Sequence, residues 1–176
     1  MKNSQEVMKF MQLFKQSLNV DLLNDPAASD LLTLRTRLIF EEMGELSDSL
    51  QALHIWKKIH KGPLAEANRR AALHDVIDGL VDVLYVCYGF FHAFGLNPDA
   101  AFDIVHISNL SKLNEHLKPV YRPDGKVLKS QYFKPPDFKD LINAAYGPPS
   151  IRPRQRSGQT SDATQSESAS LARTLC

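Results

Sequence analysis

Residues 41–45, Glu41-Glu42-Met43-Gly44-Glu45, lie in the middle of a stretch whose apolar side chains recur at helical spacing. This periodicity predicts a long helix over residues 30–58. Advancing about 100° per residue places the three glutamates in the same arc as the apolar residues Leu34, Leu38 and Leu53. A run of solvated charges would occupy the opposite side of the helix. The helix is therefore predicted to carry its glutamates on the side that faces the protein.

The next apolar stretch repeats this arrangement. The turn signal Gly62-Pro63 separates the two stretches, so residues 64–94 are predicted to form a neighbouring, antiparallel helix. On this helix Asp75, Asp78 and Asp82 share one stripe with apolar residues. Up to six carboxylates are thus expected to face inward from two adjacent helices.

Six inward-facing carboxylates require a compensating charge. Their repulsion and desolvation would exceed the net stability of a domain, about 5–15 kcal/mol. Lys and Arg are scarce on both stripes, whereas oxygen ligands suit Mg²⁺, Mn²⁺ or Ca²⁺ better than zinc. Mg²⁺ commonly shares its coordination shell with substrate phosphates, which indicates phosphoryl chemistry. The predicted metal ligands are Glu41, Glu42, Glu45, Asp75, Asp78 and Asp82.

Three more helices are predicted from periodicity and from turn residues. The first is expected over residues 4–19, a fourth over 98–115, and a short last helix over 137–145. Pro135-Pro136-Asp137 is expected to cap the last helix, and Ser29-Asp30 to cap the long helix that carries the glutamates.

The carboxy-terminal part of the chain differs in composition. Residues 118–129 are typical of an irregular or hairpin segment around an Asp-Gly turn. From Gly147 onward the chain has few large apolar residues and cannot offset its ordering entropy, which predicts disorder. We therefore predict an all-α fold, a four- to five-helix bundle, with one domain over residues 1–146 and a disordered tail over residues 147–176.

Composition excludes several classes of protein. The 176 residues carry a net charge of +1, so bulk charge gives no indication of nucleic acid or membrane binding. No uninterrupted apolar run reaches the roughly 18 residues needed to span a bilayer, and the amino terminus lacks a signal-peptide core. The two cysteines, Cys87 and Cys176, form no disulfide framework, which favours a reducing, cytoplasmic location. No glycine-rich phosphate loop is present, so P-loop and Rossmann folds are excluded.

The ordered acidic motifs resemble the all-α nucleoside triphosphate pyrophosphohydrolase superfamily, which includes MazG, dimeric dUTPases and phosphoribosyl-ATP pyrophosphohydrolases. Its signature is EExxE on one helix and ExxD on the next. Residues 41–45 match the first motif, and residues 80–85 resemble the second. Residues 105–112 and 124–129 are similar to the MazG-like branch, and the resemblance covers about residues 30–140.

One position departs from the signature. Gly79 stands three residues before Asp82, where the motif has glutamate. Asp75 and Asp78 can be read as a DxxD version of the motif. We expect Asp78 and Asp82, with Asp75, to complete the metal site.

The resemblance implies a Mg²⁺-dependent hydrolase, with Mn²⁺ as a substitute, that converts a nucleoside triphosphate and water to a monophosphate and diphosphate in housecleaning of the nucleotide pool. Glu41 or Glu42 would act as the catalytic base. A homodimer or a dimer of dimers is expected, because both long helices carry apolar residues on more than one face. The expected substrate-binding residues are Asn109, Lys112, Arg122, Lys126 and Lys129.

Three alternatives remain from the sequence. An HD-type phosphohydrolase would use His74-Asp75 with His54 and His60, although His74 points about 100° away from the acidic stripe. A ferritin-like di-iron protein would need two Glu-x-x-His pairs, and the chain offers only Asp103-Ile104-Val105-His106. A non-catalytic helical dimer that acts as a binding or regulatory module would be consistent with Gly79.

Overall fold

The computed structural model describes residues 2–59 and 62–149. Within these ranges no strand is present, and one isolated antiparallel bridge pairs Tyr121 with Val127. The all-α prediction is confirmed, and the two long helices match their predicted limits to within two residues. The helices are α1, Lys2–Leu13; α2, Ala28–Lys58; α3, Pro63–Ala93; α4, Pro98–Leu110; and α5, Lys139–Tyr146.

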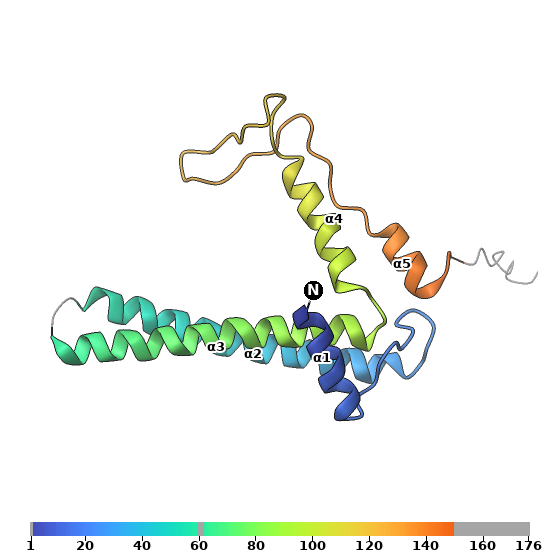
Figure 1. The fold of residues 1–176 in the computed structure, drawn as a ribbon, viewed down its shortest axis with the longest axis horizontal. Helices are drawn as coiled ribbons and strands as arrows, with labels where there is room; N and C mark the ends of the chain where they lie inside the picture. Colours follow the sequence, from blue (N-terminus) through green and yellow to red (C-terminus); the bar gives the residue numbers. More distant parts are fainter. Residues whose placement is uncertain (1, 60–61, 150–176) are drawn as a thin grey trace, which may run out of the picture.

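The two long helices α2 and α3 run antiparallel, side by side, and form the longest part of the molecule (Figure 1). Two glycines of α3 define their register. A Cβ added at Gly79 would lie 3.2 Å from Leu46 Cα, and one added at Gly89 would lie 3.0 Å from Arg35 Nη1. Because the helices are antiparallel, the residue number on α2 falls as the residue number on α3 rises. This register therefore places Asp82 of α3 opposite Glu42 of α2.

A stripe of small and apolar residues on α3 makes this close approach possible. Ala72, Val76, Gly79 and Gly89 are buried, and spacings of three and four residues keep Ala72, Val76 and Gly79 on one helix face. Small side chains allow two helix axes to come together closely because little volume separates the backbones. The α2–α3 contact is therefore fixed by backbone proximity as well as by interdigitated side chains.

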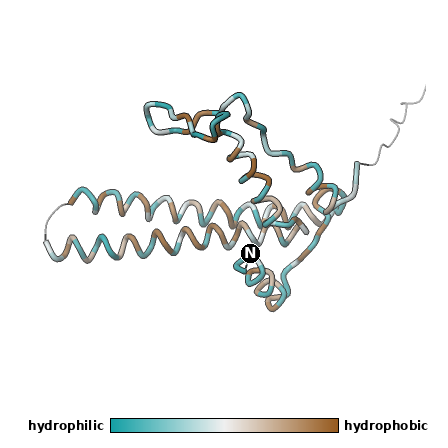
Figure 2. The backbone as a smooth tube through the Cα atoms, turned by 45° about the horizontal axis from the view of Figure 1, so that its top comes forward, coloured by the Kyte–Doolittle hydropathy of each residue, from teal (hydrophilic) through white to brown (hydrophobic). Residues whose placement is uncertain are grey.

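The buried core lies at one end of the helix pair, where α1 crosses it (Figure 1). Val7 and Met11 of α1 pack there with Ala28, Ala93 and Phe94. Figure 2 shows hydrophobic residues recurring along both long helices, well beyond the region that α1 covers. Much of the apolar surface of α2 and α3 is consequently exposed in a single chain.

Two helix ends differ from the sequence prediction. The first helix stops at Leu13 rather than near residue 19, because Lys15 and Asn19 adopt positive φ angles of 54° and 55° that interrupt a helix. The fourth helix ends at Leu110 rather than at residue 115, and Lys112 N then bonds to Asn109 O in a turn.

The predicted cap of α2 is also wrong. α2 begins at Ala28, one residue before Ser29, and its N-cap residue Ala27 makes no side-chain cap bond. The Asp25 Oδ1 accepts from Ala27 N at 2.8 Å instead, so the turn upstream already orients the chain. Asp137 is likewise not the N-cap residue of α5, which is Phe138 and makes no side-chain cap bond. Asp137 lies one residue earlier, and its Oδ1 accepts from Lys139 N at 2.9 Å.

The carboxy-terminal part leaves the helix pair and comes back to it. α4 points away from the end of α3, an irregular segment follows, and α5 returns to the base of α4 (Figures 1 and 2). The Tyr146 hydroxyl of α5 donates to Phe94 O at 2.7 Å and ties this return to the core. The segment between α4 and α5 is therefore a projection with both ends anchored.

Helix α3 is long and apolar enough, by length and composition, to cross a membrane. Only 22% of its most apolar window is buried inside the chain. Core helices of soluble proteins pass the same test, so this property by itself is weak support for a membrane span. The predicted disordered tail from residue 150 onward, Cys176 included, lies outside the described residues, as does His60.

Candidate active site

The α2–α3 pair has two different faces. In each helix, the residue directly after a contact position lies on one side of the pair, and the residue directly before it lies on the other side. Because the two helices are right-handed and antiparallel, the residues that come directly after contact positions lie on the same side in both helices. The contact positions are Glu42, Leu46, Ser49 and Leu53 on α2 and Ala72, Val76, Gly79, Val83 and Val86 on α3.

The residues that precede the contact positions are acidic, and those that follow them are mostly apolar. We call the first group the carboxylate face: Glu41, Glu45, Asp48, Asp75, Asp78 and Asp82. We call the second group the apolar face: Met43, Ser47, Leu50, His54, Leu73, Ile77, Leu80 and Leu84.

Glu42 is where the carboxylate face meets the helix contact. Burial raises the pKa of the Glu42 carboxyl above its usual value, and repulsion from Asp82 across the contact raises it further. Smaller contributions come from Glu45, Glu41 and Asp78. The structure thus brings five of the six predicted metal ligands into one electrostatically coupled group.

Asp75, the sixth predicted ligand, stands apart. It is not among the groups that act on Glu42, and its Oδ1 lies 3.3 Å from the ring Nδ1 of its chain neighbour His74. The expectation that all six carboxylates face inward is wrong. Glu42 and Asp82 are half-buried, whereas Asp75, Asp78, Glu41 and Glu45 are exposed, because they lie beside the helix contact and not within it. Asp48, which was not predicted from the sequence, also lies on the carboxylate face. Its position three residues after Glu45 indicates the same side of α2.

The charge around this group is uniformly negative. Residues 38–56 and 71–91 contain seven carboxylates and no Lys or Arg. No group of three or more metal-ligating side chains in residues 2–59 and 62–149 stands close enough to form a ready-made metal site. Carboxylate oxygens that lack a neutralising cation are nevertheless the donor set that Mg²⁺ or Mn²⁺ prefers, so the residues fit such an ion in kind.

Gly79, the departure from the family signature, has a packing role. It is buried against α2, and a Cβ there would lie 3.2 Å from Leu46 Cα and 3.3 Å from Leu46 Cβ. These distances are tighter than ordinary van der Waals contact. A glutamate at this position would meet the α2 backbone, so the carboxylate of the second motif must come from another position on α3.

The five predicted substrate-binding residues lie elsewhere, at the end of α4 and in the segment after it. Lys112 Nζ donates to Asn109 Oδ1 at 2.6 Å, and Lys129 Nζ stands 4.2 Å from the centre of the Phe133 ring. Arg122 Nε donates to Asp124 Oδ1 at 2.8 Å.

The turn that carries Lys126 is the predicted hairpin. Arg122 N donates to Lys126 O at 2.8 Å, and Gly125 at the tip has a φ of 84°. In the part of the chain that the structure describes, no hydrogen bond or ion pair links any of these five residues to the carboxylate face.

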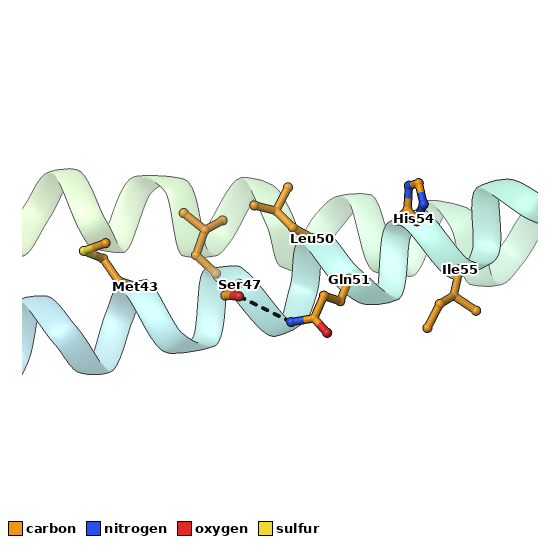
Figure 3. Close-up of a pocket in the computed structure, with 7 residues that line it drawn as sticks. Met43, Ser47, Leu50, Gln51, His54 and Ile55 are labelled. Atoms are coloured by element: carbon orange, nitrogen blue, oxygen red, sulfur yellow. Dashed lines mark hydrogen bonds between the residues drawn. The ribbon is translucent and has the colours of Figure 1, made fainter.

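A shallow cavity of about 580 Å³ lies on the apolar face, on the other side of the helix pair from the carboxylate face. Figure 3 shows Met43, Ser47 and Leu50 on successive turns of α2, with Gln51 Nε2 donating to Ser47 Oγ at 3.4 Å. All of its lining residues come from α2, so it is an open strip along one helix rather than an enclosed site.

The histidine-based alternative gains no support from the geometry. His74 is exposed and contacts Asp75 as its sequence neighbour, and His54 projects from α2 on the apolar face (Figure 3). Among the described residues no histidine joins a cluster of metal-ligating side chains.

One comparison with known proteins identifies a family. The family model described as phosphoribosyl-ATP pyrophosphohydrolase matches residues 7–109, which is more than half of the chain. The matched range contains the whole carboxylate face and ends at Asn109, before the projecting segment. A comparison with curated proteins finds no match.

Proposed function

The chain belongs to the phosphoribosyl-ATP pyrophosphohydrolase family, within the MazG-like all-α superfamily, and we propose that it is a Mg²⁺-dependent hydrolase of nucleoside triphosphates. Membership of the family makes it a pyrophosphohydrolase. The products would be a nucleoside monophosphate and diphosphate, consistent with nucleotide-pool housecleaning. The cytoplasmic location remains a prediction from the sequence.

One observation carries this proposal. Burial, and then repulsion from four other carboxylates, raises the pKa of Glu42, and residues 38–56 and 71–91 supply no Lys or Arg to neutralise these carboxylates. Binding of cations would relieve the repulsion between them. Cations held by carboxylates suit a polyphosphate substrate, because the phosphates complete the coordination.

The proposed reaction is hydrolysis of the bond between the α-phosphorus and the oxygen that bridges it to the β-phosphorus. A water oxygen bonds to the α-phosphorus, the bond from that phosphorus to the bridging oxygen breaks, and diphosphate leaves with the electron pair. Glu41 or Glu42 takes the proton that the water loses. Glu42, Glu45, Asp78 and Asp82 would hold the ion, with Asp75 at the edge of the group. When bound, Mg²⁺ supplies positive charge to the phosphate oxygens and makes water more acidic.

The first experiment measures diphosphate release by the full chain with Mg²⁺. The substrates are the ribonucleoside and deoxyribonucleoside triphosphates, dUTP and, because of the family, phosphoribosyl-ATP. A single turnover in ¹⁸O-water is expected to place the label in the monophosphate. Label in the diphosphate would show attack on the β-phosphorus and contradict the mechanism. An inert wild-type chain would favour the non-catalytic module.

We also propose that the active form is a homodimer paired through the apolar face. This face is free of charge, so two copies can meet on it without repulsion, whereas two carboxylate faces would repel each other. Exposed apolar side chains recur on consecutive turns of this face, such as Ile77, Leu80 and Leu84, and a contiguous patch of this kind is typical of a protein–protein interface.

Two adjacent residues give a matched test of this interface. Leu80 on the apolar face and Val81 on the other side of α3 are 49% and 54% exposed. Leu80→Lys is expected to convert the dimer to a monomer in light scattering, and Val81→Lys to leave the dimer intact. A Leu80→Lys protein that stays dimeric would place the interface elsewhere.

A further inference from the structure

The segment between α4 and α5 has a defined shape of its own. We call residues 112–134 the basic arm. Within it Leu128 N donates to Val120 O at 2.7 Å and Ser130 Oγ donates to Leu113 O at 2.7 Å. Ser108 Oγ of α4 donates to Lys134 O at 2.7 Å and closes the loop at its base. The arm is thus held by α4 and by itself.

The arm is not attached to the helix pair of its own chain. In residues 2–59 and 62–149, no hydrogen bond, ion pair or aromatic contact joins the arm to α2 or α3, and both views show it standing apart from them (Figures 1 and 2). Several of its apolar side chains are nevertheless exposed; Leu117 is 77% exposed and Tyr121 is 58% exposed. Such exposure is typical of a surface that contacts another molecule.

The charge of the arm is opposite to that of the carboxylate face. The arm contains six Lys and Arg residues and only two acidic residues, Glu115 and Asp124. In the described part of the chain Arg122 is ion-paired with Asp124, while no carboxylate pairs with Lys112, Lys126 or Lys129. The seven carboxylates of residues 38–56 and 71–91 are the complementary surface on this protein.

The path of α4 directs the arm away from the carboxylates of its own chain. Leu84, Cys87 and Phe91 line an apolar groove of about 520 Å³ together with Phe102 and Val105 of α4. Leu84 and Cys87 directly follow the contact positions Val83 and Val86, so α4 starts on the side of the apolar face, where a second copy would pack. The 13 residues of α4 span about 20 Å, the thickness of roughly two helix layers.

We propose that the basic arm of one chain closes over the carboxylate face of a second copy. Each active site then takes its carboxylates from one subunit and its phosphate-holding cations from the other. Lys112, Arg122, Lys126 and Lys129 would contact the β- and γ-phosphates of the substrate bound at the other subunit. This inference rests on the proposed function and on the proposed dimer.

Subunit mixing tests the arrangement. One chain carries Asp82→Asn, which damages the carboxylates and leaves the arm intact. The other carries Lys126→Ala with Lys129→Ala, which damages the arm and leaves the carboxylates intact. The two chains carry different tags, are expressed together, and the mixed dimer is purified. Diphosphate release is measured with the best nucleotide found for the wild type.

The arrangement in trans predicts recovery of activity. In the mixed dimer one site has intact carboxylates and an intact arm, so turnover should reach about half that of the wild-type dimer, well above either parent. A mixed dimer no more active than its parents would show that each arm serves its own chain. A dimer that mixes Glu42→Gln with Asp82→Asn is the control, because both of its sites lack a carboxylate under either arrangement.

A second measurement does not depend on activity. Wild-type chains with natural and ¹⁵N isotopes are mixed, cross-linked with a carbodiimide that joins lysine to carboxylate, and analysed by mass spectrometry. Links between the arm and α2 or α3 should contain both isotopes. Links of a single isotope throughout would overturn the proposal. A wild-type chain that cleaves no nucleotide would instead refute the proposed function.

Discussion

Gly79 of α3 lies against the backbone of Leu46 of α2, so that a Cβ at residue 79 would be 3.2 Å from Leu46 Cα. Backbone atoms cannot turn aside as a flexible side chain can, and any substituent must push the helices apart. Asp82 is one turn further along α3 and faces Glu42. The distance between these two carboxylates therefore depends on the absence of a side chain at Gly79.

Gly79→Ala is expected to lower the melting temperature and to weaken Mn²⁺ binding, measured by calorimetry, because it separates α2 from α3. The control is Gly44→Ala on the same helix pair, where a Cβ meets nothing within 4 Å. Gly44→Ala should stabilise the protein by about 0.5–1 kcal/mol through helix propensity. Equal stabilisation by both substitutions would show that the contact at Leu46 is loose. Gly79→Glu should be harmful rather than restore a ligand.

Removing one carboxylate from the coupled group should impair catalysis. Glu42→Gln and Asp82→Asn are each expected to lower kcat about a hundredfold or more, or about 3 kcal/mol of transition-state stabilisation. Glu66→Gln, on α3 outside the group, is the control and should retain near wild-type turnover, since the Glu66 carboxylate accepts from Arg69 and Arg70 and does not act on Glu42. Full activity of both Glu42→Gln and Asp82→Asn would place the active site elsewhere.

The raised pKa of Glu42 predicts a pH-dependent effect on the metal-free protein. The ionised carboxylate destabilises the folded state above the folded-state pKa, and protonation relieves this cost as the pH falls. Glu42→Gln should therefore melt at or above the wild-type temperature at pH 7, and the difference should shrink below the usual glutamate pKa. Glu66 has a lowered pKa through Arg69, so Glu66→Gln should show the opposite sign at pH 7.

Divalent cations should stabilise the folded chain. Mg²⁺ or Mn²⁺ is expected to raise the melting temperature in proportion to the logarithm of its concentration, because it binds the folded state preferentially. Excess chelator should reverse the shift and abolish turnover. The double variant Glu42→Gln with Asp82→Asn should show a smaller shift. Undiminished turnover in chelator would refute the requirement for metal.

Deletion of residues 150–176 should leave folding and turnover close to those of the full chain. The last helix ends at Tyr146, whose hydroxyl bonds to Phe94 O, so the deletion removes none of the described contacts. The deleted stretch also lacks a core-forming pattern of apolar residues. Circular dichroism and diphosphate release on the truncated chain check this, and an insoluble product would assign the tail a structural role.

Much of the fold could be predicted from the sequence, because long helices follow from the regular spacing of apolar residues along one segment. The limits of α2 and α3 and the turn at Gly125 follow from side chains that act on their own segment. The end of α1 and the start of α2 were misplaced, because backbone turns rather than cap residues decide them. Local patterns do not report such turns.

The sequence by itself determined the helical class, the family signature and the residue types of an acidic site, since periodicity and motif spacing are properties of single helices. Only the tertiary structure decided which carboxylates act on one another electrostatically. It places Glu42 where repulsion from Asp82 acts on it, and it leaves Asp75 beside His74. It also shows that Gly79, which departs from the family signature, packs against α2. It also held the arm lysines away from the carboxylates of their own chain. The reason is that register and the direction of α4 depend on contacts between helices, which no single helix encodes.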